Sequence, residues 1–96
     1  MTTPTQIIDA VCQRTGVTRD QLADSGRMPL VRKARGIVVY LCRELCGLSY
    51  QDIAVAMGRS RTCHPSLIAW ERAFSDGLWC DQWHRIAGAI RKELGQ

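Results

Sequence analysis

The sequence lacks any apolar stretch near the roughly 18–20 residues that a bilayer-spanning helix needs. Its N-terminus also lacks the basic region and apolar run of a signal peptide. No alternation of apolar and polar residues is long enough to predict a strand, and no repeat or low-complexity segment occurs. These absences argue against membrane-spanning, secreted and repeat proteins, and they predict a cytoplasmic all-α domain.

Motifs for nucleotide binding and catalysis are missing as well. The chain contains no G-x-x-x-x-G-K-[ST] phosphate loop, no other glycine-rich loop and no paired carboxylates for acid–base chemistry. The adjacent Cys63-His64 could supply a nucleophile and a base, but neighbouring side chains on a helix diverge by about 100° and do not readily share a hydrogen bond. The sequence therefore predicts a protein that is not an enzyme and that needs no cofactor.

Cysteine spacing leaves a metal site as a weaker alternative. The five cysteines are an odd number, so in a cytoplasmic protein we expect reduced thiols. Cys42 with Cys46, and Cys80 with His84, lie four residues apart on predicted helices and could bind zinc if the two pairs converged. No C-x-x-C motif occurs, however, and Cys42 falls on the apolar stripe of its helix. Core thiols are the favoured interpretation, and no metal is expected.

Positive charge is concentrated in one half of the chain. The 96 residues are 46% hydrophobic and 23% charged, which is typical of one globular domain spanning 1–96. The net charge is +4, but residues 27–72 hold eight Lys or Arg and three acids, so this segment alone carries +5. A concentrated basic segment in a small domain with a pI near 9.0 favours an anionic partner.

Capping signals and apolar spacing predict about six helices. Thr3-Pro-Thr-Gln6 and Thr18-Arg-Asp-Gln21 both have the pattern of a capping box, and Pro29 can open the longest helix. Val31, Ala34, Ile37, Val38, Leu41, Cys42 and Leu45 form its apolar stripe. The predicted helices run from Thr3 to Gly16, Thr18 to Ala23, Pro29 to Gly47, Ser49 to Gly58, Cys63–Pro65 to Phe74, and Cys80 to Leu94.

The fourth and fifth predicted helices form a helix-turn-helix. Ser49 caps the first of them, Gly58 begins the turn, and small Ala54 and Gly58 suit a close approach of the two helices. Such a motif places its second helix in the major groove of double-stranded DNA. We therefore expect sequence-specific binding to duplex DNA.

The residue types around the motif suggest how DNA would be held. Side chains at the entry of the second helix can read base edges or contact a thymine methyl: Arg59, Arg61, Thr62, His64, Pro65 and Ser66. Cations on or before the long helix most simply neutralise phosphates: Arg32, Lys33, Arg35 and Arg43. The backbone amides of Tyr50 and Gln51, after the Ser49 cap, could hold a further phosphate.

The segment resembles the C-terminal DNA-binding domain of DnaA, the bacterial chromosomal replication initiator. Ala34-Arg35, Tyr40-Leu-Cys-Arg-Glu-Leu45, and Gly47 through Ala54 with Met57-Gly58 are similar to that family's A-R-x-I-A-x-Y-L-x-R-E-L-T-x-L-S-x-x-E-I-G-x-x-F-G. The resemblance implies a Trp-repressor-like helix-turn-helix. It also implies that Arg27 enters the minor groove, that Arg35 and Arg43 contact DNA, and that Ser49 to Gln51 bind phosphate.

The chain departs from the family where bases are read. The family has G-G-R-D-H-[ST]-T-V, whereas this chain has Gly58-Arg-Ser-Arg-Thr-Cys-His-Pro-Ser-Leu67. Aligning His64 with the family histidine requires two extra residues in the turn and keeps Leu67, Ile68 and Arg72 in phase; an ungapped alignment instead uses Arg61 to His64. In either case the specificity is expected to differ from that for a DnaA box.

These observations predict a small transcriptional regulator of phage or gene-transfer-agent type. Without a phosphate loop, residues 1–96 are not expected to melt an origin as an initiator does. RNA polymerase or a regulatory protein is a possible partner. The alternatives are a non-specific architectural DNA binder and a protein-interaction adaptor that docks through Trp70, Trp79 and Trp83, although these tryptophans could instead seal the core.

Overall fold

The computed structural model describes residues 3–23, 29–59, 64–75 and 81–94, except the side chains of 64, 66, 73–75 and 81. All regular structure in these ranges is helical, which confirms the predicted all-α class. No helix among them is long and apolar enough to cross a membrane. The helices are α1 (Pro4–Thr15), α2 (Arg19–Ala23), α3 (Pro29–Leu41) with a π-helical turn η1 (Cys42–Cys46), α4 (Tyr50–Ala56), α5 (His64–Ser75) and α6 (Asp81–Leu94).

The first two helices begin as their capping boxes predict. The Gln6 amide donates to the Thr3 hydroxyl at 3.3 Å, and the Thr3 amide donates to the Gln6 side chain at 3.0 Å. The Thr18–Gln21 pair makes the same two bonds, at 2.9 and 3.1 Å. These reciprocal bonds satisfy amides that have no partner within the first helical turn.

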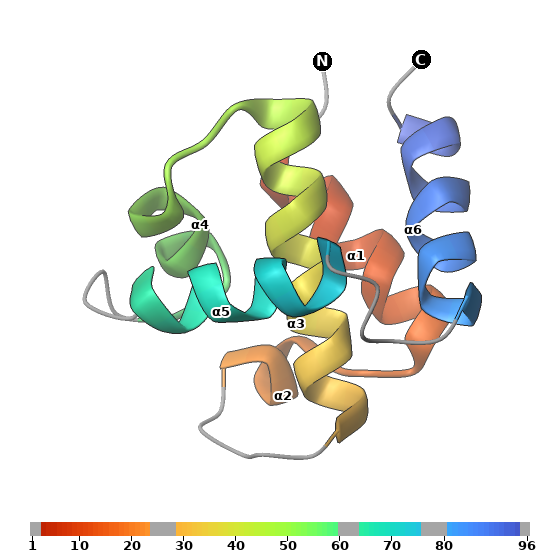
Figure 1. Cartoon of the computed structure of the whole chain (residues 1–96), viewed down its shortest axis with the longest axis horizontal. Helices are drawn as coiled ribbons and strands as arrows, with labels where there is room; N and C mark the ends of the chain where they lie inside the picture. Colours follow the sequence, from red (N-terminus) through yellow and green to blue (C-terminus); the bar gives the residue numbers. More distant parts are fainter. Residues whose placement is uncertain (1–2, 24–28, 60–63, 76–80, 95–96) are drawn as a thin grey trace.

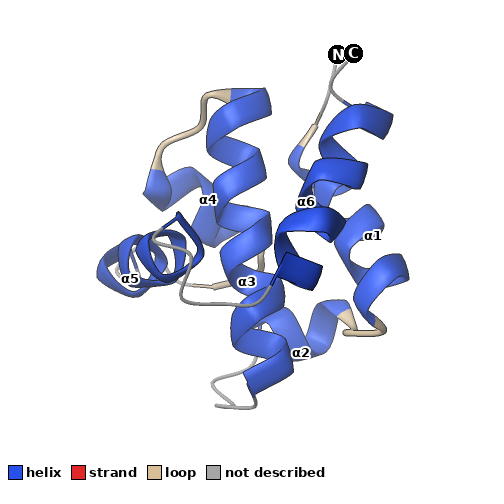
Figure 2. Cartoon of the chain, turned by 45° about the vertical axis from the view of Figure 1, so that its right-hand side comes forward, coloured by secondary structure: helices blue, strands red, loops and turns tan. Residues whose placement is uncertain are grey.

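Helix α3 forms the centre of the domain. Figures 1 and 2 show α4 and α5 on one side of it, α1 and α6 on the other, and α2 near its N-terminal end. Because neighbours cover it on several sides, α3 is buried well beyond a single stripe, at Val31, Ala34, Arg35, Gly36, Ile37, Val38, Val39 and Leu41. The continuation of α3 differs from the prediction, since its last turn widens into the π-helical η1 before Gly47 ends it with φ +64°.

Two tryptophans belong to the core. Trp70 on α5 and Trp83 on α6 are each only 8% exposed. The ring of Trp83 also lies under the Lys33 ammonium, 5.4 Å from the ring centroid. These two side chains therefore seal the core rather than offer a docking surface, while Trp79 lies outside the described residues.

Two arginines cap the C-terminal end of α2. Arg35 donates from Nε to the Leu22 carbonyl at 3.1 Å and from Nη2 to the Gln21 carbonyl at 3.0 Å. Arg59 donates from Nη1 to the Ala23 carbonyl at 3.3 Å. Carbonyls in the last turn of a helix lack intrahelical donors and carry partial negative charge, so cations are favourable there.

Both guanidinium groups also stack against one aromatic ring. Arg35 lies 5.2 Å and Arg59 lies 5.5 Å from the ring centroid of Trp70. Since Arg35 is only 3% exposed, its side chain is turned away from the surface on which it was expected to hold a DNA phosphate. The Arg35 guanidinium makes its contacts inside the domain, where it links α3 to α2 and α5.

Gly58 makes a close approach that also differs from the prediction. Its φ of +83° favours glycine, and a Cβ built there would lie 3.2 Å from the Cβ of Ala23. The glycine thus permits contact between the end of α4 and α2, whereas the sequence suggested contact between α4 and α5.

Cys42 is a completely buried thiol. Burial, with a smaller contribution from the neighbouring Cys46, raises the pKa of the Cys42 thiol from 9.0 to about 12. Zinc binding requires a thiolate, which this environment disfavours. The described residues contain no group of three or more His, Cys, Asp or Glu that could hold a metal, and Cys80 lies outside them.

Replacing Arg35 with Ala should lower the free energy of unfolding by roughly 2–4 kcal/mol, because the buried Leu22 carbonyl and the partly buried Gln21 carbonyl lose a charged donor. The matched control is Arg32→Ala, an exposed neighbour on the same helix, which should change stability by less than about 0.5 kcal/mol. Urea unfolding followed by circular dichroism measures both. Equal effects of the two substitutions would contradict the structural role of Arg35.

Gly58→Ala should destabilise the domain more than Gly16→Ala does. Both glycines have left-handed backbones, at φ +83° and +76°, for which a side chain costs roughly 1–2 kcal/mol. A Cβ on Gly16 meets nothing within 4 Å, so only Gly58→Ala adds crowding, worth about 1 kcal/mol or more. Thermal unfolding of the two variants separates the cost of the left-handed backbone from the cost of crowding. Equal losses of stability in the two variants would argue against the contact with Ala23.

The buried thiol also predicts a pH dependence. Because the folded pKa of Cys42 is raised, its contribution to stability is complete below pH 9 and is lost as the pH rises from 9 towards 12. Above pH 9 the wild type should therefore lose stability more steeply than Cys42→Ala, by up to about 1.4 kcal/mol per pH unit. Urea unfolding at several pH values with a reductant measures this difference. Parallel curves would show that the folded state does not hold this proton.

Candidate nucleic-acid interface

Helices α4 and α5 lie in the arrangement of a helix-turn-helix. They pack against each other on the same side of α3 (Figure 2). α4 ends at Ala56 and α5 begins at His64, so the connection is longer than the three or four residues of a short turn. A helix that begins at His64 fits the alignment with extra residues in the turn, and Leu67 on it is completely buried, as that register requires.

The first turn of α4 is exposed around its cap. The Ser49 hydroxyl accepts from the Asp52 amide at 3.2 Å, and its carbonyl accepts from the Ile53 amide at 3.0 Å. Ser49 and Gln51 are exposed, and Tyr50 is half-buried. The phosphate contact at the Tyr50 and Gln51 amides stays a prediction.

The described face of α5 that points to solvent is small and partly basic. Pro65, Ala69 and Arg72 are exposed at spacings of four and three residues, which places them on one side of the helix. Arg72 contributes to the charge of the segment but was not among the residues predicted to bind DNA. Its helical spacing from Pro65 is the signal that could have identified it.

The predicted phosphate-binding cations occupy different surroundings. Arg32 is exposed, and the Arg43 side chain is 42% exposed beside α4 and α5. Lys33 instead lies over Trp83 of α6, which directs it towards that helix. The structure therefore leaves Arg32 and Arg43 on the surface and turns Arg35 inward.

Arg59 also differs from the expectation for a DNA-facing residue. It is half-buried, its guanidinium donates to Ala23, and it lies against Trp70. Its position fixes the chain after Gly58 against α2 and α5. The sequence missed this role because the contacting residues are 36 and 11 positions away along the chain.

The remaining predicted DNA contacts lie outside the described parts of the molecule. Arg27, Arg61 and Thr62 are outside the described residues, as are the side chains of His64 and Ser66. The backbone at His64 and Ser66 belongs to the first turn of α5.

A cluster of three side chains joins η1, α4 and α5. The Tyr50 hydroxyl donates to Oε1 of Glu71 at 3.1 Å, and Arg43 Nε lies 3.2 Å from Oε2 of the same carboxylate. The Arg43 guanidinium lies 4.2 Å from the centre of the Tyr50 ring. Desolvation raises the pKa of Tyr50, and its hydrogen bond to Glu71 adds to this effect.

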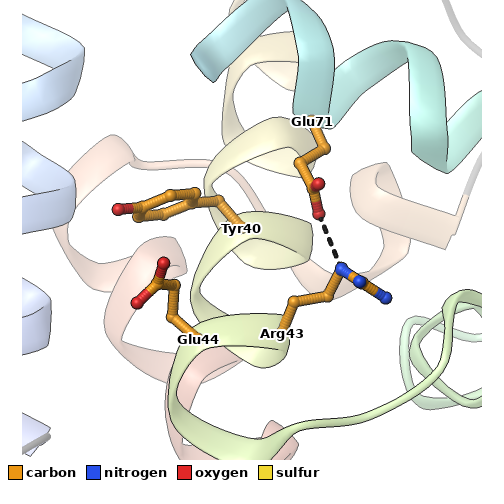
Figure 3. A pocket seen from close by; sticks show the side chains of 4 residues that line it. All are labelled: Tyr40, Arg43, Glu44 and Glu71. Atoms are coloured by element: carbon orange, nitrogen blue, oxygen red, sulfur yellow. Dashed lines mark ion pairs between the residues drawn. The ribbon is translucent and has the colours of Figure 1, made fainter.

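The cluster borders an open pocket of about 450 Å³ (Figure 3). Its lining residues are Tyr40, Arg43, Glu44 and Glu71. The two carboxylates make this pocket unsuitable for a phosphate, and the terminal nitrogens of Arg43 point away from Glu71 (Figure 3).

Comparison with known proteins agrees with this arrangement. Residues 4–63 match the family described as the bacterial dnaA protein helix-turn-helix. Over 75 residues, or 78% of the chain, the sequence is 38% identical to the chromosomal replication initiator protein DnaA of Corynebacterium jeikeium, and it spans 12% of that protein's length. The chain therefore belongs to the DnaA C-terminal helix-turn-helix family and is a DNA-binding helix-turn-helix domain of the DnaA type.

Proposed function

We propose that this domain binds duplex DNA sequence-specifically, with α5 in the major groove and α4 against the backbone. The observation that carries the proposal is the family's helix-turn-helix, with α4 and α5 packed together and one face of α5 exposed. Among the described residues, this face carries no acidic side chain, because Glu71 is ion-paired with Arg43.

The proposed roles follow from placement and residue chemistry. Bases are read by Arg61, which precedes α5, and by His64, Pro65 and Ser66 at the start of α5, and Arg27 enters the adjacent minor groove. Phosphates are held by Arg32, Arg43, Arg72 and the amides of Tyr50 and Gln51. The buried or half-buried Arg35 and Arg59 support this surface from within and make no DNA contact.

The target is proposed to differ from a DnaA box. The family match ends at residue 63, directly before α5, and the family's aspartate and one threonine are absent from the reading segment. Because the chain spans 12% of its relative, the initiator's own activity is not transferred to it. We assign the domain to the small transcriptional regulators of phage or gene-transfer-agent type, which carry out no catalytic step. Its proposed protein partner is RNA polymerase or a regulatory protein, which would bind the domain on DNA.

Selection from a random duplex pool at near-physiological salt should enrich one motif of about one helical turn. Arg43→Ala should weaken binding to all sequences and reduce the slope of log affinity against log salt by about one. Arg14→Ala is a matched control, because Arg14 has a similar exposure of 41% and is also ion-paired, but with Glu93 on α6. It should leave both the affinity and the slope unchanged.

The alternatives give different results in the same experiment. Retention without an enriched motif would indicate a non-specific or architectural DNA binder. No retention at low salt would contradict DNA binding and favour the protein-interaction adaptor.

A further inference from the structure

Glu71 is an unexpected residue for the second helix of a DNA-binding motif. A carboxylate near the phosphate backbone is repelled by it, so an acid there should weaken binding. The Glu71 side chain is only 22% exposed, however; its Oε1 accepts a hydrogen bond from the Tyr50 hydroxyl, and its Oε2 is ion-paired with Arg43, 3.2 Å from Nε. The acid therefore acts on its neighbours more than on solvent.

The carboxylate and the tyrosine ring constrain Arg43 from two sides. Oε2 of Glu71 forms an ion pair with Arg43, 3.2 Å from its Nε, but accepts no hydrogen bond from the described residues, and the Tyr50 ring centre lies 4.2 Å from the guanidinium. In Figure 3 the two terminal nitrogens of Arg43 point away from Glu71. An arginine whose ion pair lies on the Nε side keeps its terminal N–H groups for a phosphate, which they match in geometry.

Constraining Arg43 matters because its side chain is long and exposed. Ordering such a side chain on binding costs conformational entropy, and a side chain that is already ordered in the unbound protein avoids most of that loss. Tyr50 is fixed by the same carboxylate, so one acid on α5 orders groups from η1 and α4.

We infer that Glu71 is a positioning residue for DNA binding, whose carboxylate holds Arg43 and Tyr50 in the orientation that meets a backbone phosphate. This inference rests on the proposed function. Glu71 differs in this respect from Glu44, which lines the same pocket but pairs with Arg91 of α6 at 3.3 Å.

Removing Glu71 should weaken DNA binding although it removes a negative charge. With the duplex enriched in the selection, or a mixed-sequence duplex if none is enriched, Glu71→Ala should reduce affinity roughly three- to tenfold. Glu71→Gln keeps an acceptor for Tyr50 and should act in the same direction but less strongly. The matched control Glu44→Ala should bind as tightly as the wild type or more tightly.

A double-mutant cycle separates positioning from a general structural effect. In the Arg43→Ala background, Glu71→Ala should no longer weaken binding, because the arginine that it positions is gone. Binding is measured by fluorescence anisotropy well below the melting temperature of each variant, and Glu71→Gln serves if Glu71→Ala does not fold.

The outcomes distinguish this inference from the proposed function. If the wild type fails to bind DNA, both are overturned. If the wild type binds while Glu71→Gln binds equally or more tightly, the positioning role alone is overturned. Equal losses from Glu71→Ala with and without Arg43 would also overturn it.

Discussion

The capping of α2 by two arginines is the interaction on which the rest of the structure depends. Arg35 from α3 and Arg59 from the end of the α4 segment donate to the last carbonyls of α2, and both lie against Trp70 of α5. Four parts of the chain meet in this contact. Carbonyl and guanidinium groups that are buried or partly buried are each unfavourable without a partner, so each group requires the others to stay in place.

This contact divides the basic residues of the central segment into two groups. Arg35 and Arg59 stabilise the domain from within, whereas Arg32, Arg43 and Arg72 remain on the surface. The net charge of the segment therefore overstates the charge that a DNA backbone would meet. The acid on α5, Glu71, is ion-paired with Arg43. Its negative charge is therefore partly neutralised within the domain.

The helices could be predicted because their signals are local. Thr3, Thr18 and Ser49 mark helix starts by bonds within four residues, and Gly16 and Gly47 end helices because they adopt left-handed backbones. The helix-turn-helix followed from the same signals. The sequence gives a weaker signal for the burial of Arg35. This residue lies four positions after Val31 and four before Val39, which are both buried, and that spacing places Arg35 on a covered face of the helix.

The sequence by itself determined the starts of the capped helices, the all-α class and the family, since each rests on nearby residues or on a matching motif. Only the tertiary structure decided which cations face solvent, that Gly58 contacts Ala23, and that Glu71 holds Arg43 and Tyr50 together. These contacts join residues far apart in the chain. Their formation depends on how the helices cross, and the crossing is set by packing of the whole core rather than by any local pattern.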